Sequence, residues 1–241
     1  MKVNLRTPSR ALAIGAHPDD IEFGAGATLA KWAAGGCEIL HLVCTDGSKG
    51  SWDPAEDTAQ LVLTRQAEQR AASVALGGRG EVVFLGWPDG ELRNGSRQQS
   101  QVTHWIRRFR PDVVLGHDPW RRYRLHPDHR HAGFLTTDST VSARDPHFFR
   151  EQAIEHHRPA TLLLFEAQEP DHVEDVSGFA EHKVKALLAH RSQWRSTMLI
   201  SDPDSAAEVE AFRSRVLDQL ARDGQLAGVS EGEAFKCIED T

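Results

Sequence analysis

Cysteine is scarce in this 241-residue sequence, which contains only Cys37, Cys44 and Cys237. The count is odd and no pair has C-x-x-C spacing, which excludes a disulfide framework and a cysteine zinc site. Cys44 lies in an apolar stretch, so we expect it to be a small core residue. Such sparse cysteine is typical of a reducing compartment, and we therefore expect a cytoplasmic protein.

Long apolar runs and an excess of basic charge are also missing. The apolar stretch at 11–16 is shorter than a signal-peptide core and far shorter than a membrane span. The net charge is −7, whereas a nucleic-acid-binding protein needs a basic face. We expect no membrane span and no nucleic-acid partner. The sequence leaves the oligomeric state open, a homo-oligomer included.

Short apolar segments alternate with helix-like segments along the chain. This alternation predicts a parallel sheet with helices on both faces. No repeat, low-complexity tract or shift in composition marks a boundary, so we expect residues 1–241 to form a single α/β domain. The expected strands are 11–16, 38–44, 81–85, 112–116 and 161–165, and the expected helices are 26–34, 57–76, 99–109, 178–191 and 205–222.

Polar residues follow the predicted strands. In open α/β sheets, ligands bind beyond the carboxyl ends of the strands. We expect these residues to converge on one rim, together with residues 126–129, which are expected to form a short loop further along the chain. The residues that follow strands are His17, Asp19, Asp20, Asp46, Asp89, His117 and Asp118.

The first cluster at this rim is residues 17–20, with the sequence HPDD. Pro18 fixes its own φ and favours an extended backbone at His17. The adjacent carboxylates of Asp19 and Asp20 repel each other, and a bound cation would relieve that repulsion. One Asp alone would be explained as a helix N-cap. A histidine and two aspartates at a strand end favour a metal site.

The second cluster is residues 126–129, with the sequence HPDH. His126 and His129 are three residues apart and can face the same side of a helix. The alternative is a helix start with two solvated histidines, because Pro127 suits the first helical position. Catalytic zinc commonly has three His and Asp or Glu ligands plus water. Two histidines and one aspartate from the two clusters would match that set.

Residues 16–20 (AHPDD) and 126–129 (HPDH) resemble the two marks of the LmbE-like deacetylases, also called the PIG-L family. The resemblance extends over most of the chain, so residues 1–241 are expected to form one LmbE-like deacetylase domain. The further matching segments are 20–24 (DIEFG), 45–47 (TDG), 65–68 (RQAE), 88–90 (PDG), 185–193 (KALLAHRSQ) and 233–235 (EAF).

The resemblance implies a Rossmann-like, mostly parallel sheet flanked by helices. It implies a zinc-dependent hydrolase that removes an acetyl group from the amide nitrogen of an N-acetylglucosamine-type conjugate, a small-molecule substrate. It also implies that one zinc ion is bound by His17, Asp20 and His129. Asp19 would then be the general base, and His126 would stabilise the oxyanion or protonate the leaving group. The residues expected to contact substrate are Arg65, Asp89 and Arg124.

One position departs from the family pattern. Some members that act on thiol-sugar conjugates carry a catalytic tyrosine where this chain has Arg124. The tyrosine of this chain, Tyr123, stands one position earlier. Thiol-sugar substrates are therefore not expected. Arg121, Arg122 and Arg124 form either a clamp for an anionic group or a solvated loop. Three tryptophans lie in predicted rim loops: Trp52, Trp87 and Trp120. They either form an aromatic wall that contacts a sugar ring or pack within their loops.

Two other classes of function compete with hydrolysis. One is a non-catalytic metal- or sugar-binding domain, and the other is a nucleotide-binding α/β protein. Residues 24–28 (GAGAT) begin like a dinucleotide fingerprint, but Leu29 stands where the third glycine should be. Close packing of a helix on a sheet explains these glycines better. Hydrolysis is favoured because Asp19 and His126 are left over after metal binding.

Overall fold

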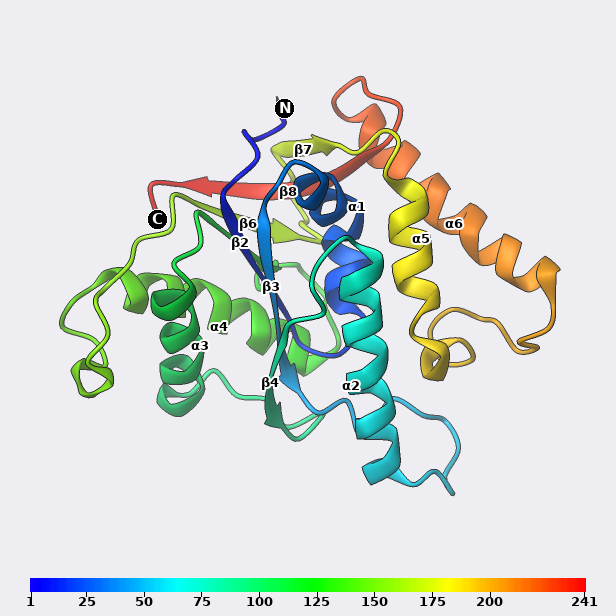
Figure 1. The fold of residues 1–241 in the computed structure, drawn as a ribbon, viewed down its shortest axis with the longest axis horizontal. Helices are drawn as coiled ribbons and strands as arrows, with labels where there is room; N and C mark the ends of the chain where they lie inside the picture. The colour runs from blue at the N-terminus through cyan, green and yellow to red at the C-terminus, as the bar shows by residue number, and fades with distance from the viewer.

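A single eight-stranded sheet forms the centre of the computed structural model, which describes residues 1–241 (Figure 1). Its strand order is β1-β7-β8-β6-β5-β2-β3-β4. Neighbours among β2 to β6 pair in parallel, whereas β8 runs antiparallel to β6 and β7. The strands are β1 (Lys2–Val3), β2 (Arg10–Gly15), β3 (Glu38–Thr45), β4 (Val82–Trp87), β5 (Val113–His117), β6 (Thr161–Phe165), β7 (His172–Asp175) and β8 (Gly232–Glu239).

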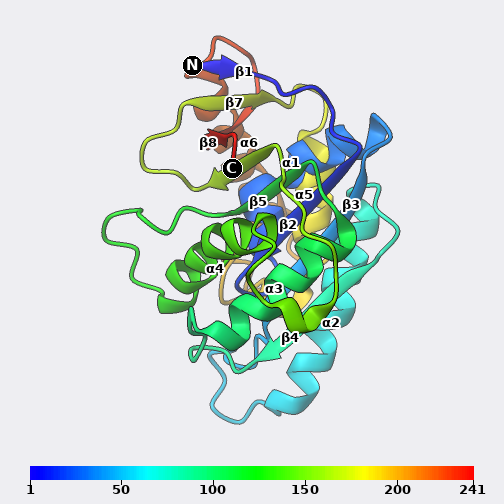
Figure 2. The ribbon, with the colours of Figure 1, turned by 90° about the vertical axis from the view of Figure 1, so that its left-hand side faces the viewer.

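Helices cover both faces of the sheet, which confirms the predicted mostly parallel α/β fold (Figures 1 and 2). Helices α1, α2 and α5 lie on one face, α3 and α4 lie on the other, and α6 packs on the outer side of α5. No helix is long and apolar enough to cross a membrane. The helices are α1 (Asp20–Ala34), α2 (Thr58–Ala75), α3 (Ser96–Phe109), α4 (Pro127–Arg144), α5 (Ala180–Leu188) and α6 (Ala206–Gln225), with short 3₁₀ turns η1 (Arg150–Gln152) and η2 (Arg191–Gln193).

Strand β2 shows why its sequence is apolar throughout. Ala11 and Ala13 belong to the core between the sheet and α1, α2 and α5. Leu12 and Ile14 belong to the core between the sheet and α3 and α4. Because both faces of the strand are covered, successive residues are buried whichever way they point.

Helix α1 is interrupted at Ala25, whose φ of −148° is not helical. The second part begins at Gly26, where the sequence predicts the helix to start. At the break, the buried carboxylate of Glu233 accepts hydrogen bonds from the backbone N–H groups of Ala27 and Thr28, at 3.1 and 2.7 Å. Lys183 donates to the same carboxylate at 2.7 Å. A Cβ on Gly24 would lie 2.4 Å from the Phe165 ring, so close packing does explain this glycine.

The expectation that residues 126–129 form a loop is wrong, because they begin helix α4. The sequence of α4 is rich in Ser, Thr and His, and this composition hides its helical period. Strands β7 and β8 were also not predicted. Strand β8 lies between β6 and β7, so its formation depends on partners far away in the sequence.

The strand order places the ligand site. Strand β2 has β3 on one side and β5 on the other, so the chain reverses its direction of winding between β2 and β5. A crevice forms beyond the carboxyl ends of strands at such a point. Helix α4 crosses close to the end of β5 because Gly133 has no side chain there. A Cβ at Gly133 would lie 2.7 Å from the carbonyl oxygen of His117.

Replacement of Glu233 by alanine should destabilise the fold strongly. It would leave Lys183, whose side chain is 7% exposed, without its ion-pair partner. Removal of one partner of a buried ion pair typically costs about 3–5 kcal/mol. The check is urea denaturation of Glu233→Ala beside Glu239→Ala, which breaks the exposed Lys2–Glu239 pair on the same strand. Glu239→Ala should unfold near the native midpoint, and equal midpoints for both variants would contradict this account.

Candidate active site

The turn after β2 brings an imidazole and two carboxylates to the crevice. Asp20 Oδ2 accepts a hydrogen bond from the backbone N–H of His17 at 2.7 Å, which closes the turn. Asp19 lies between them with φ +104°, in the left-handed region. A residue without glycine's freedom costs of order 1–3 kcal/mol in such a conformation, and it persists only where its surroundings hold it.

Donor atoms of three residues from the two predicted clusters lie at nearly equal separations, with both carboxylate oxygens of Asp20 taking part. His17 Nδ1 is 3.3 Å from Asp20 Oδ2 and 3.2 Å from His129 Nε2, and His129 Nε2 is 3.3 Å from Asp20 Oδ1. An ion with tetrahedral bonds of about 2.0–2.1 Å separates its ligand atoms by about 3.3 Å. The spacing and the donor types therefore fit a tetrahedral divalent ion with one open position.

Two carboxylates contact Nε2 of His17, the ring nitrogen on the side away from the other donor atoms. Nε2 of His17 lies 3.2 Å from Asp89 Oδ1 and 3.2 Å from Asp128 Oδ2. Asp128 also accepts from the backbone N–H groups of Gly90, at 2.6 Å, and Leu92, at 3.2 Å. These contacts direct Nδ1 of His17 toward the crevice, as outer carboxylates commonly do for metal-binding histidines. Asp89, expected to contact substrate, thus also orients His17.

His117 and Glu166 support the opposite side of the donor cluster. Nε2 of His117 lies 3.2 Å from Asp20 Oδ2, and its Nδ1 lies 3.2 Å from Glu166 Oε2. Burial opposes the charged form of Glu166, but its partners His117 and Arg124 hold the pKa of its carboxyl at about 2. His117 lies at the rim as expected, whereas Glu166 is not among the predicted rim residues. Glu166 directly follows strand β6, so the rule that located the other rim residues would have found it.

Other combinations of side chains also bring three possible ligand atoms together. They are His17 with His126 and His129, Asp20 with His117 and His129, and His17 with Asp89 and Asp128. In the last set, the carboxylates face Nε2 of His17 and already accept backbone hydrogen bonds. His17, Asp20 and His129 all line the pocket, as does the set with His126, whereas His117 and Asp128 lie outside the pocket lining.

Asp19 is buried beside the donor cluster, and its carboxylate accepts no hydrogen bond. The nearest cation is Arg65, with Nη2 3.7 Å from Asp19 Oδ2. Burial raises the pKa of Asp19 to about 6, against the opposing effect of Arg65. Arg65 donates to the backbone carbonyls of Gly47 and Pro18 at 2.8 and 2.7 Å. Much of its hydrogen-bonding capacity is therefore used to hold the turn that carries Asp19.

His126 caps helix α4 and leaves one ring nitrogen free. Its Nδ1 accepts from the backbone N–H of Asp128 at 3.3 Å, so the neutral ring carries its proton on Nε2. The ring stacks on His129 with centroids 4.8 Å apart and meets His17 edge-on at 4.7 Å. Burial and the neighbouring His17 lower the pKa of His126. The uncharged ring is thus favoured, and it still offers an N–H donor.

The arginines before the second cluster do not form an open clamp. Arg124 lines the pocket, but its Nη2 lies 2.6 Å from Glu166 Oε2 and it also contacts His129 Nδ1. Arg121 and Arg122 are exposed and lie outside the pocket lining, as does Tyr123.

The cluster forms the floor of a pocket of about 620 Å³. Of the three rim tryptophans, only Trp52 lines this pocket, and it is largely exposed at the edge. The predicted site residues that line the pocket are His17, Asp19, Asp20, Arg65, Asp89, Arg124, His126 and His129.

Comparison with known proteins relates this architecture to sugar deacetylases. A curated diacetylchitobiose deacetylase from Thermococcus kodakarensis is 34% identical over 188 residues, which cover 77% of this chain and 70% of that protein. A 1D-myo-inositol 2-acetamido-2-deoxy-alpha-D-glucopyranoside deacetylase from Saccharomonospora viridis is 30% identical, covering 76% of this chain and 84% of that protein.

A solved structure and a family model agree with these relatives. The N,N'-diacetylchitobiose deacetylase from Pyrococcus horikoshii superposes with a TM-score of 0.86 at 28% identity, covering 96% of this chain and 84% of that one. The PIG-L family model, described as GlcNAc-PI de-N-acetylase, matches residues 12–140, which span both histidine clusters. The chain therefore belongs to the PIG-L family.

Proposed function

We propose that this chain is a zinc-dependent N-deacetylase that removes the acetyl group from a 2-acetamido sugar. The arrangement at the pocket floor carries the proposal. Donor atoms of three residues have spacings close to those of tetrahedral ligands, and Asp19 and His126, whose Nε2 is free, line the same pocket. Amide hydrolysis needs a proton acceptor and a proton donor. A site that only held a metal would need neither.

The charges in the pocket favour a neutral sugar conjugate. Each cation that lines it already has a partner: Lys49 contacts the backbone carbonyl of Asp89, Arg65 binds two backbone carbonyls, and Arg124 pairs with Glu166. An anionic aglycone would have to compete with these acceptors for the cations. The two curated relatives are both named for acetamido-sugar substrates.

The purified protein should release acetate from an N-acetylglucosaminyl conjugate. We expect a neutral conjugate to have a kcat/KM at least as high as that of an acidic conjugate of similar size, because the pocket cations are paired. The measurement is acetate release across a panel of matched neutral and acidic N-acetylglucosaminides. Acetate release from none of them would reject the proposed activity, and a strong preference for the acidic members would restore the arginine clamp.

Zinc is the ion that best suits two imidazoles, one carboxylate and an open position. Purified protein should contain about one equivalent of zinc, and His129→Ala should lose most of it because a ligand is removed. His131→Ala is the matched control, since it changes a histidine in the same helix that does not line the pocket. Elemental analysis of both variants makes the test, and full zinc retention in His129→Ala would remove His129 from the ligand set.

The protein groups around the metal can handle the protons of hydrolysis. When bound, zinc supplies a Lewis acid that polarises the amide carbonyl and makes the attacking water more acidic. Asp19 takes a proton from that water as the water oxygen bonds to the carbonyl carbon. The Nε2–H of His126 donates a hydrogen bond to the carbonyl oxygen as negative charge develops there. The C–N bond breaks when the nitrogen gains a proton from either Asp19 or His126, which yields the amine and acetate.

Asp19→Ala and His126→Ala should each lower kcat by roughly 10²–10⁴, the usual contribution of a positioned acid or base. Both variants should keep their zinc, because neither side chain is assigned as a ligand. Turnover and zinc content are measured on the same samples, with His131→Ala as the control. Near-normal turnover in a zinc-loaded Asp19→Ala enzyme would exclude Asp19 as the base.

A further inference from the structure

The position of the Asp19 carboxylate depends on its backbone. No protein group donates a hydrogen bond to this carboxylate, and the nearest cation, Arg65, is 3.7 Å away. The direction of the side chain therefore depends strongly on the left-handed backbone at this residue, with its φ of +104°. Because such a conformation is unfavourable outside glycine, some neighbouring group must stabilise it.

Two side chains of helix α2 hold the peptide before Asp19: Arg65 donates to its carbonyl at 2.7 Å, and Gln69 contacts its N–H. Gln69 Oε1 accepts a hydrogen bond from the backbone N–H of Asp19 at 2.9 Å. Its Nε2 donates to Glu22 Oε1 at 2.7 Å. A carboxylate only accepts hydrogen bonds, so Glu22 requires the amide nitrogen on its side and leaves the amide oxygen for Asp19. Glu22 thus sets the orientation of the Gln69 amide, and this orientation provides the acceptor for the Asp19 N–H.

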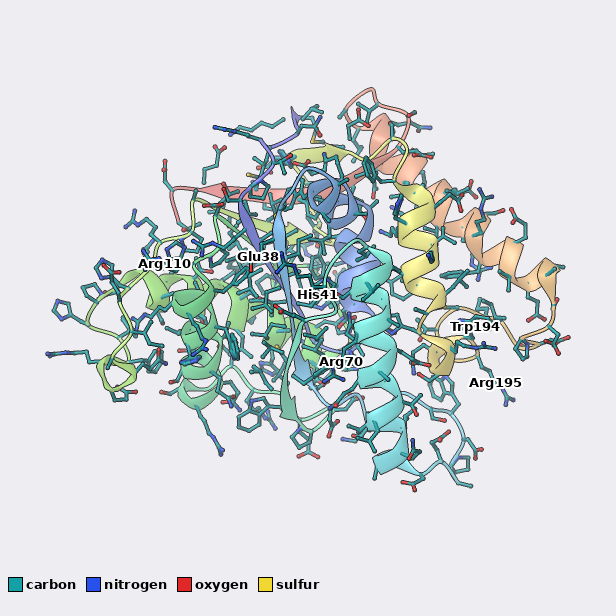
Figure 3. The ribbon with its side chains drawn as sticks, in the orientation of Figure 1. Glu38, His41, Arg70, Arg110, Trp194 and Arg195 are labelled. Carbon is teal, nitrogen blue, oxygen red and sulfur yellow. The ribbon has the colours of Figure 1, made fainter.

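The surroundings of this pair make the arrangement rigid. Gln69 and Glu22 are fully buried beneath the pocket. His41 of β3 (Figure 3) lies with Nδ1 3.4 Å from Glu22 Oε1, and His190, after α5, lies with Nε2 3.4 Å from Glu22 Oε2. Both ring nitrogens of His190 lack a hydrogen-bond partner, so this buried ring has no polar contact closer than the Glu22 carboxylate. Four separate segments of the chain therefore meet at the Glu22 carboxylate, which orients the Gln69 amide.

We propose that Gln69 is a positioning residue for the deacetylase reaction. With its amide oriented by Glu22, it holds the backbone of Asp19 so that the carboxylate points into the pocket beside the donor atoms. The inference rests on the proposed function for its effect on turnover. The effect of Gln69 on the conformation of Asp19 does not depend on the identity of the substrate.

The first test compares Gln69→Met, which keeps the side-chain length but removes the hydrogen bonds to Asp19, Glu22 and His41, with the unaltered zinc-loaded enzyme. We expect kcat to fall roughly 10–100-fold, as is typical when a group that orients site residues is removed. KM and zinc content should not change. Gln98→Met, at a buried glutamine of α3 outside the pocket lining, is the matched control and should keep full turnover.

A double-mutant cycle separates positioning from general damage. If Gln69 acts through Asp19, Gln69→Met should have no further effect on kcat in an Asp19→Ala background. A full additional loss in that background, or unchanged kcat in the single variant, would overturn the proposal. The exchange Glu22→Gln with Gln69→Glu should restore much of the turnover. The exchange places a carboxylate at position 69, where the Asp19 N–H needs an acceptor, and an amide at position 22, which can donate to that carboxylate.

A crystal structure of Gln69→Met gives a readout that needs no activity. The Asp19 backbone should leave the left-handed region and its carboxylate should turn away, while His17 and Asp20 keep their places. An unmoved Asp19 would overturn the inference even if the enzyme deacetylates sugars. If Asp19 is displaced in Gln69→Met but the unaltered protein releases no acetate, the positioning role is supported and only the proposed reaction is rejected.

Discussion

The buried carboxylate of Asp128 joins the segments on which the site depends. It receives hydrogen bonds from the His17 ring, the backbone of Gly90 and the backbone of Leu92. These groups belong to the turn after β2 and the loop after β4, whereas Asp128 itself is in the first turn of α4. A buried carboxylate without partners would be costly, so each segment stabilises the placement of the other two. The donor atoms are therefore brought together as part of folding.

Carboxylates of the same chemical type have different environments within this pocket. Burial disfavours the ionised form of Asp89, but the neighbouring His17 and the N–H of Lys49 hold its pKa at about 2. Asp19 has no hydrogen-bond donor, and burial raises its pKa to about 6. Pairs of carboxyl groups whose environments separate their pKa values are how active sites assign a fixed charge to one and proton exchange to another.

The fold and the floor of the site could be predicted from sequence because the relevant signals are local. Strand β6 and helix α2 are bounded by patterns that need no distant partner, and the predicted family is confirmed. His17, Asp20 and His129 stand in two short motifs. The antiparallel strand β8 and the roles of Asp128 and Gln69 were missed, because each depends on contacts with residues distant in the sequence. Composition hid helix α4, and a helix start at its first residues was only the alternative to the expected loop.

The close approach of α4 to β5 has a consequence for how this site can vary. At Gly133 a Cβ would lie 2.7 Å from the His117 carbonyl, and at Gly116 a Cβ would lie 2.6 Å from Thr136 Oγ1. A larger residue at either position would lift the helix as a rigid body. His126, Asp128 and His129 would then shift together, although the proposed mechanism gives them separate roles in proton donation, ring orientation and metal binding. Two close contacts between α4 and β5 thus couple the three proposed roles, so that substrate preference is free to diverge in the loops while the spacing at the floor stays fixed.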